Sequence, residues 1–254
     1  ITAQRDDADL EWPPAVDPPI TVRMPLDPFE RGEAARLVEA VVGGAVADTL
    51  VDQLYERSGG NPLFLTELAE LAKANPSSTA LPGSLRALIA ARLDRLPPSQ
   101  RSIIDNASVL GASGRVESLQ KFAVEMQQEF DDDDIEVLAD DGLIELDGDS
   151  WRFRSDVVRE VAYQTLTKLV RAQRHAGTAS VMVHSPTIPF DQVAHHAASA
   201  AELVAEIGPV PGVAPNITEQ AVLLLRDAAR RSIDVGAFNQ ARRHATRALD
   251  LGVH

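Results

Sequence analysis

The chain contains no cysteine among its 254 residues. Disulfide bonds, thiolate metal sites and cysteine nucleophiles are therefore excluded. This absence fits a reducing compartment, so we expect the protein to be cytoplasmic. Long apolar runs are also missing. No segment approaches the roughly 20 apolar residues that a membrane helix needs, and the first residues lack the pattern of a signal peptide, so no membrane partner is expected.

Basic residues are scarce. There are 24 Lys and Arg against 38 Asp and Glu, which gives a net charge of −14. The densest charge run, Asp131 to Asp134, is acidic and would repel phosphates, so the composition argues against nucleic acid as a partner. The same run lacks the Gly and Glu spacing of a calcium loop and is typical of a solvated helix start.

The usual catalytic motifs are absent. There is no Gly-x-x-x-x-Gly-Lys-Ser/Thr phosphate loop, and ATP hydrolysis by these residues alone is not expected. The nearest fragment, Gly111 to Arg115, has no lysine and is interpreted as a turn between two helices. There is no Gly-x-Ser-x-Gly elbow. His195 and His196 are adjacent, and neighbours on a helix point about 100° apart, which argues against a shared metal. We therefore predict no catalytic and no metal-ligating residue.

The first 97 residues divide into two parts. Residues 1–25 are rich in Asp and Pro and end in an alternating apolar stretch, which predicts a loop and a short strand. Because the chain opens on Ile1 without an initiator Met, we expect it to be a fragment. Residues 26–97 predict a small domain of short helices. Asp27 and Pro28 are typical of a helix start, and Pro97 ends the last helix.

Residues 98–184 change in character. Three helices are predicted at about 100–110, 117–125 and 132–140, followed by two short alternating stretches joined by Asp147-Gly148-Asp149. Three helices with such a β-hairpin indicate a winged helix. A single long helix is predicted from about 156 to 183.

Residues 185–254 are helical again. Two helices, at 219–235 and 237–251, are joined at Gly236 and carry small residues that would let them pack as an antiparallel pair. The predicted fold class is therefore mainly α: a small helical domain, a winged-helix domain with a small β-hairpin, and helical repeats.

Three motifs carry a resemblance to a known family. Ser58 to Leu68, with Leu81 to Arg86 and Ala91 to Pro97, resembles the lid of bacterial STAND ATPases, signal-transduction ATPases of the AAA type. Trp151 to Tyr163 is similar to the winged-helix end of that family, and Gly236 to Leu249 to its tetratricopeptide (TPR) repeats. The resemblance implies a remnant of the ATPase core at 1–25, a lid at 26–97, a winged helix with its connecting helix at 98–184 and a TPR-like region at 185–254.

The resemblance also implies nucleotide contacts. Gly60, Asn61 and Pro62 match a Gly-x-Pro element that lies against adenine in the family, although the same pattern also serves as a plain helix stop and start. Arg5 lies where the family has a sensor of the terminal phosphate. The family's Phe-Arg-His reaches the β-phosphate through its histidine, whereas this chain has Phe153-Arg154-Ser155. Ser155 can donate one hydrogen bond but carries no charge.

The function implied is regulatory. Relatives of this kind are fused to class III nucleotidyl cyclases or to response-regulator DNA-binding domains. The chain would couple nucleotide state and a protein partner on its helical repeats to such an output domain, and the parent would carry any ATPase or cyclase activity. ATP or ADP would be held mainly by the upstream ATPase core, with no tight binding by this chain. Two alternatives are a nucleotide-independent interaction scaffold and a winged-helix DNA-binding regulator, which the acidic start of the third winged-helix helix disfavours.

Overall fold

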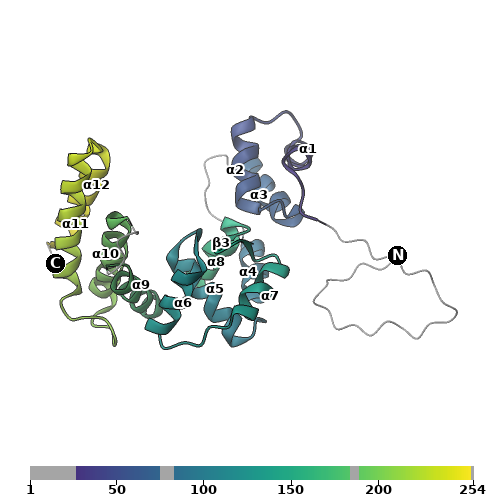
Figure 1. The fold of residues 1–254 in the computed structure, drawn as a ribbon. Helices are drawn as coiled ribbons and strands as arrows, with labels where there is room; N and C mark the ends of the chain where they lie inside the picture. The colour runs from purple at the N-terminus through teal and green to yellow at the C-terminus, as the bar shows by residue number, and fades with distance from the viewer. Residues whose placement is uncertain (1–26, 75–82, 184–188, 253–254) are drawn as a thin grey trace.

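The computed structural model describes residues 27–74, 83–183 and 189–252, which form twelve helices and three short strands (Figure 1). The predicted mainly α class is confirmed. The loop and strand predicted at 1–25 lie outside the described residues, as does Arg5. None of the described helices combines the length and apolar character that a membrane span requires.

The first unit consists of α1 (Arg31–Val42), α2 (Asp48–Ser58) and α3 (Pro62–Ala74), which pack on one another. The prediction that α1 starts with Asp27 as cap and Pro28 as first residue is wrong. Glu30 caps the helix, and it forms a capping box with Glu33. The reason is tertiary: the backbone N–H of Phe29 donates to the carbonyl of Gly60 at 2.8 Å, which holds this stretch outside the helix.

A second unit follows, made of α4 (Gly83–Leu93), α5 (Pro98–Leu110), α6 (Val116–Glu125), α7 (Asp132–Asp140) and α8 (Asp156–Thr165) with a small antiparallel sheet. The sheet contains β1 (Ser113–Arg115), β2 (Ile144–Asp147) and β3 (Ser150–Phe153) in the order β1-β3-β2. The predicted hairpin is confirmed, with Ile144 opposite Phe153 and Asp147 opposite Ser150.

Strand β1 lies where the sequence indicated only a turn. Gly114 packs under Trp151, where an added Cβ would lie 3.2 Å from the indole ring. Trp151 in turn donates its ring N–H to the carbonyl of Arg115 at 3.2 Å. Trp151 is only 1% exposed, and its contacts with Gly114 and Arg115 hold residues 113–115 in the sheet. The sequence of the strand itself contains no motif from which this contact could be predicted.

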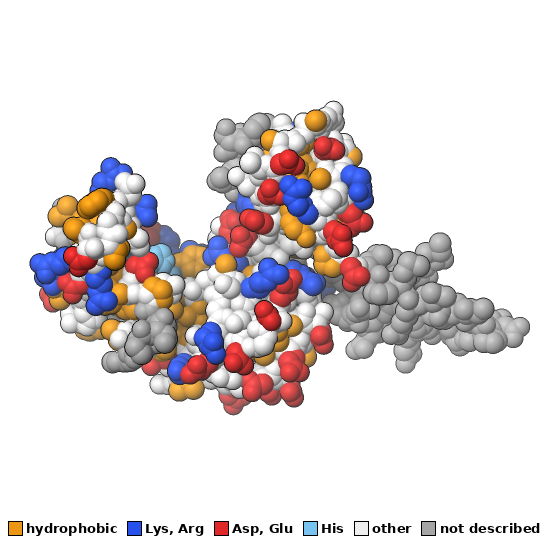
Figure 2. All heavy atoms as spheres, turned by 45° about the horizontal axis from the view of Figure 1, so that its top comes forward, with side chains coloured by type: hydrophobic (Ala, Val, Ile, Leu, Met, Phe, Trp, Pro, Cys, Tyr) orange, Lys and Arg blue, Asp and Glu red, His pale blue; other side chains and the backbone are white. Residues whose placement is uncertain are grey.

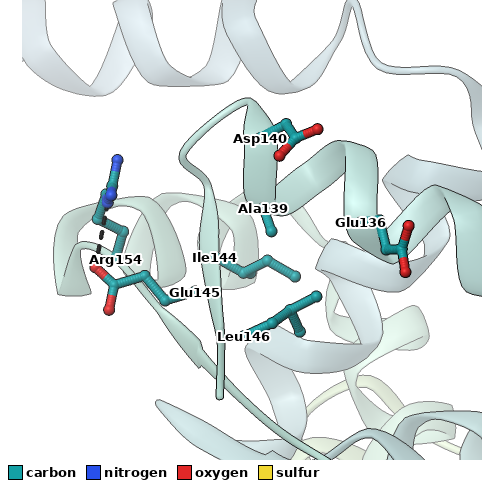
Figure 3. A pocket seen from close by; sticks show the side chains of 7 residues that line it. All are labelled: Glu136, Ala139, Asp140, Ile144, Glu145, Leu146 and Arg154. Carbon is teal, nitrogen blue, oxygen red and sulfur yellow. Dashed lines mark hydrogen bonds and ion pairs between the residues drawn. The ribbon is translucent and has the colours of Figure 1, made fainter. Parts of the chain in front are cut away.

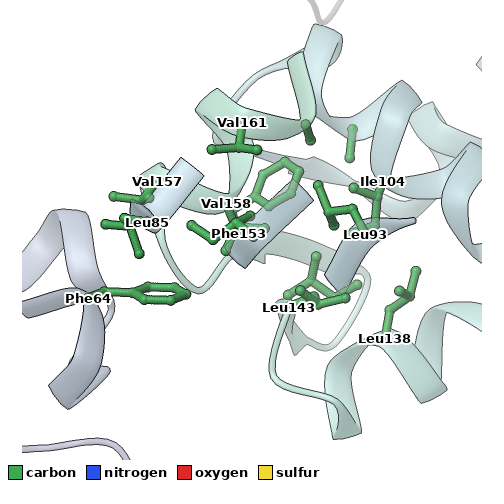
Figure 4. Packing of buried hydrophobic residues seen from close by; sticks show 14 of the residues in the cluster. Phe64, Leu85, Leu93, Ile104, Leu138, Leu143, Phe153, Val157, Val158 and Val161 are labelled. Carbon is green, nitrogen blue, oxygen red and sulfur yellow. The ribbon is translucent and has the colours of Figure 1, made fainter. Parts of the chain in front are cut away.

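The core of the second unit is formed by apolar side chains from its helices and its sheet (Figure 4). Leu85 and Leu93 of α4 are buried in it with Val157 and Val161 of α8. Helix α4 thus packs onto α8, across the boundary at residues 97 and 98 that the sequence suggested. Phe64 extends from α3 toward the same region, so one apolar cluster runs from the first unit into the second.

The remaining helices, α9 (Lys168–Val183), α10 (Phe190–Ile207), α11 (Ile217–Asp234) and α12 (Phe238–Gly252), lie side by side in chain order (Figure 1). A second, alanine-rich cluster fills the spaces between them. Small side chains let helix axes approach closely.

The single helix predicted from 156 to 183 is wrong, because Leu166 adopts an extended conformation and separates α8 from α9. Thr165 and Thr167 flank this break. The Thr165 hydroxyl donates to the carbonyl of Ala162, and the Thr167 hydroxyl accepts from the backbone N–H of Val170. Threonine side chains compete with helical backbone bonds in this way.

Candidate ligand-binding site

A pocket of about 320 Å³ lies between the first and second units. Two segments far apart in the sequence meet there, the turn between α2 and α3 and the junction between β3 and α8. We call this pocket the crease. Its walls are formed by Ser58, Gly59, Asn61, Pro62, Arg154 and Ser155, with further residues from the segment before α1, from α3 and α4, from the α7–β2 turn and from α8.

The glycines of the α2–α3 turn have positive φ angles, +60° at Gly59 and +73° at Gly60. A Cβ on Gly59 would lie 2.0 Å from the carbonyl oxygen of Arg154, and one on Gly60 would lie 2.5 Å from that of Phe29. Both positions therefore require glycine, for the backbone conformation and for the close approach. Gly59 marks the direct contact between the two units.

Asn61 and Pro62 start α3. The side-chain oxygen of Asn61 accepts the backbone N–H groups of Leu63, at 3.0 Å, and Phe64, at 3.3 Å, as an N-cap does. Pro62 occupies the first helical position, where its missing N–H costs nothing, and its ring is exposed at the crease. Helix initiation alone thus explains the Asn61-Pro62 pattern. The apolar ring of Pro62 nevertheless lines the pocket.

Ser155 is 4% exposed and joins the two units. Its hydroxyl donates to the carbonyl of Arg57 at the end of α2. The Arg57 guanidinium lies 3.6 Å from the Glu160 carboxylate of α8, which adds a partly buried ion pair across the same contact. The single proton of the Ser155 hydroxyl is therefore already donated in the hydrogen bond that joins the two units.

Two arginines supply positive charge to the crease. The Arg154 Nε atom lies 3.2 Å from Oε1 of Glu145, and Arg92 donates to the carbonyl of Asp141. Asp27 and Asp141 also line the pocket, so its charges are balanced. An anionic group entering the crease would compete with Glu145 for Arg154, since both would accept from the same guanidinium.

Apolar atoms cover another part of the wall. Pro28, Pro62, Phe64 and Val158 line the crease, and Phe64 points from α3 toward α8 (Figure 4). The crease thus combines apolar surface with a few polar and charged groups, and its size lies at the lower end of the range of small-molecule sites.

The structure brings most of the predicted site residues together. Asn61, Pro62 and Ser155 all line the crease, whereas Gly60 is buried behind it and holds the start of α1 through its carbonyl. Sequence reasoning did not assign Arg92 or Arg154 to the site. Arg154 stands in the quoted Phe-Arg-Ser pattern, but only the fold shows that it lines the same pocket as the α2–α3 turn.

A second polar cluster lies where α8, α9, α10 and α12 meet. The Tyr163 hydroxyl is 2.9 Å from His175 Nε2, and His175 Nδ1 is 2.9 Å from His196 Nδ1. His195 points elsewhere, with its Nδ1 atom 3.1 Å from the Arg247 guanidinium. Among the described residues, no group of three or more His, Asp or Glu side chains is arranged to hold a metal ion.

Burial keeps these histidines neutral. Loss of hydration, reinforced by neighbouring histidines and Arg247, lowers the pKa of His175 to about 2 and that of His196 to about 3. Burial also lowers the pKa of His195 and His244, with Arg247 adding to the shift in both. The cluster is a neutral hydrogen-bonded connection between helices at physiological pH.

In comparisons with known proteins, no family model, no curated protein and no solved structure matches the chain.

Proposed function

We propose that this chain is the regulatory part of a signal-transduction ATPase of the STAND type. In this proposal the first unit with α4 is the lid, α5 to α8 with the sheet form a winged helix, and α9 to α12 are TPR-like repeats. The observation that carries the proposal is the crease. Asn61 and Pro62 of the Gly-Asn-Pro turn line one pocket with Arg154 and Ser155 of the Phe-Arg-Ser junction, and the resemblance connects both segments with nucleotide.

The residues of the crease fit part of a nucleotide. Pro62 and Phe64 offer apolar surface to a purine ring, and Arg154 and Arg92 offer charge to a phosphate. The sequence has no phosphate-binding loop, so this chain would supply only some of the contacts. ATP or ADP would be held mainly by an upstream ATPase core, and the affinity of this chain alone would be low.

Ser155 stands where the family has a histidine, and the proposal has to account for that difference. Because the Ser155 hydroxyl donates to Arg57, it has no proton left for a phosphate. The positive charge that histidine would supply would come from the neighbouring Arg154, which would exchange Glu145 for the ligand. Ser155 itself would connect the winged helix to the lid through its hydrogen bond to Arg57.

Nucleotide would act by biasing the contact between the two units. A ligand that touches both walls of the crease favours the closed arrangement over an open one, by its difference in affinity for the two. A protein partner on α9 to α12 would bias the same equilibrium. The output domain, a nucleotidyl cyclase or a transcriptional regulator, would lie outside this chain, and the protein would act in the cytoplasm.

The test is an NMR titration of the chain with ADP and with ATP, which detects binding in the millimolar range. We expect amide shifts at Gly59, Asn61 and Ser155 and none in α11. Pro62→Ala and Arg154→Met should each weaken binding several-fold. Pro98→Ala is the matched control, because Pro98 is also an exposed proline at the first position of a helix, yet it lies outside the crease.

Absence of any shift at millimolar nucleotide would overturn the proposal. Shifts spread over all four C-terminal helices, or equal weakening by Pro98→Ala, would place the nucleotide elsewhere and also count against it.

A second candidate is a nucleotide-independent interaction scaffold. One observation favours it: Gly60, Asn61 and Ser155 all have structural roles that need no ligand. The same titration separates the two candidates, since a scaffold would show no response to nucleotide while keeping its crease intact.

A further inference from the structure

A second concavity, of about 500 Å³, lies alongside strand β2 on the side of α7 (Figure 3). We call it the β2 groove; its walls are Glu136, Ala139 and Asp140 of α7 with Ile144, Glu145 and Leu146 of β2, and Arg154 closes one end. Ile144 and Leu146 point to the same side of the strand, while Glu145 points to the other side, toward Arg154.

Strand β2 is the edge of the sheet, because the order is β1-β3-β2. The backbone N–H of Arg154 donates to the carbonyl of Leu143, so this pair is hydrogen-bonded across the hairpin. Bonded and non-bonded pairs alternate along antiparallel strands. The backbone groups of Ile144 and Leu146 therefore point away from β3. No backbone partner for them occurs among the described residues.

The floor of the β2 groove is apolar. Ile144 is buried, whereas Ala139 and Leu146 are partly accessible and can still bury surface against a partner. Side chains at alternate positions of an added strand would meet this floor, because strand side chains alternate between faces. The groove thus offers open backbone groups beside a small apolar floor with a charged rim.

The charge around the β2 groove has one sign. Residues 131–147 contain nine Asp and Glu and no Lys or Arg. Glu136 and Asp140 are exposed on the rim and form no ion pair with any described residue, whereas Glu145 pairs with Arg152 and Arg154. Figure 2 shows acidic side chains gathered along the lower edge of the molecule in that view. The unpaired rim acids favour a basic occupant.

We propose that the β2 groove binds an extended basic segment of a partner protein, which adds to the sheet beside β2. Its backbone would pair with Ile144 and Leu146, one apolar side chain would enter the floor, and flanking Arg or Lys would face Glu136 and Asp140. Strand addition takes its affinity from backbone bonds and its specificity from such alternate pockets. The inference does not depend on nucleotide in the crease.

The test is fluorescence anisotropy of the whole chain with a labelled peptide of alternating arginine and leucine. A peptide of alternating glutamate and leucine is the charge control. The same Arg-Leu peptide, with alternate backbone amides N-methylated, tests strand addition, because methylation removes the N–H donors while keeping the side chains. We expect binding of the Arg-Leu peptide only.

The matched variants are Glu136→Gln with Asp140→Asn in the groove, and Glu129→Gln with Asp133→Asn outside it. All four residues are exposed and both pairs remove two charges, so neither is expected to unfold the chain. The groove pair should weaken binding about ten-fold, and the outer pair far less.

Equal weakening by both pairs would overturn the proposal, since it would mean unspecific attraction to the acidic surface. Equal binding of the N-methylated peptide would overturn strand addition. Sedimentation of the chain as a dimer that the peptide dissociates would assign the groove to a second copy, and would overturn the partner proposed here.

Discussion

At the scale of single residues, Gly59 carries the closest contact between the two units. Alanine at this position would be strained by φ +60° and would also collide with the carbonyl of Arg154. Gly43 is the matched case, because it also caps a helix with positive φ, at +88°, but has open space around it.

We therefore expect Gly43→Ala to cost roughly 1–2 kcal/mol of unfolding free energy, which is the strain alone. Gly59→Ala should cost at least twice as much and should open the crease. Urea unfolding measures both values. Equal losses for the two variants would mean that the contact between Gly59 and Arg154 does not hold the units together.

The histidine cluster predicts how stability depends on pH. Unfolded His175 and His196 bind protons near pH 6.5, but the folded chain protonates them only near pH 2 and pH 3. Between those values the unfolded state holds more protons, so stability falls as the pH falls below about 6.5. By pH 5 each histidine should remove about 2 kcal/mol.

Replacing one histidine should reduce this dependence. His196→Asn keeps a side chain able to hydrogen-bond to His175 but does not titrate, so its stability should fall less between pH 7 and pH 5. The check is urea unfolding of both proteins at the two pH values. The interpretation fails if wild type and variant lose the same free energy.

At the scale of helices, one buried ion-pair network joins α5 to α9. Asp105 accepts from Arg101 at 2.9 Å and lies 3.8 Å from Arg174, whose side chain is 7% exposed. Burial raises the pKa of Asp105, and the two arginines oppose that shift. The Nε and Nη1 atoms of Arg174 have no hydrogen-bond partner among the described residues.

Substitutions of Asp105 and of Arg174 should therefore change the free energy of unfolding by different amounts. Asp105→Ala leaves Arg174 as an uncompensated buried cation and should cost about 3 kcal/mol. Arg174→Met removes a poorly satisfied cation while Asp105 keeps Arg101, so its effect should lie within about 1 kcal/mol of zero. Thermal and urea unfolding of both variants and of the double variant compare them. A larger loss for Arg174→Met would contradict this account.

At the scale of the whole molecule, charge is unevenly distributed. Residues 131–147 contain nine acidic and no basic residues, whereas residues 226–247 contain six arginines and two aspartates. If the second unit were a DNA reader, α7 would enter the major groove with its acidic first turn foremost. We expect the dissociation constant for a DNA duplex to be about 100 μM or weaker at physiological salt. Micromolar binding that weakens with added salt would favour the DNA-binding alternative instead.

Much of the fold followed from local patterns. The helix start at Asn61-Pro62, the hairpin at Asp147-Gly148-Asp149 and the helix pair joined at Gly236 each depend on a few neighbouring residues. Their conformational preferences act within one or two turns of chain, so the sequence alone suffices to predict them. Strand β1 could not be predicted in this way, because it depends on Trp151, which lies far along the chain from it. The break at Leu166 is different: Thr165 and Thr167 bond to backbone groups three residues away, so this was a local signal that the predicted single helix missed.

The candidate site divides along the same line. The sequence by itself determined that Gly60-Asn61-Pro62 forms a helix stop and start, and that Ser155 cannot carry the charge of a histidine. Only the tertiary structure decided that Pro62 and Arg154 line the same pocket, that the Ser155 hydroxyl donates to the carbonyl of Arg57, and that β2 has an open edge beside acidic side chains. These are contacts between distant segments. They depend on how whole elements pack, which no short stretch of sequence encodes.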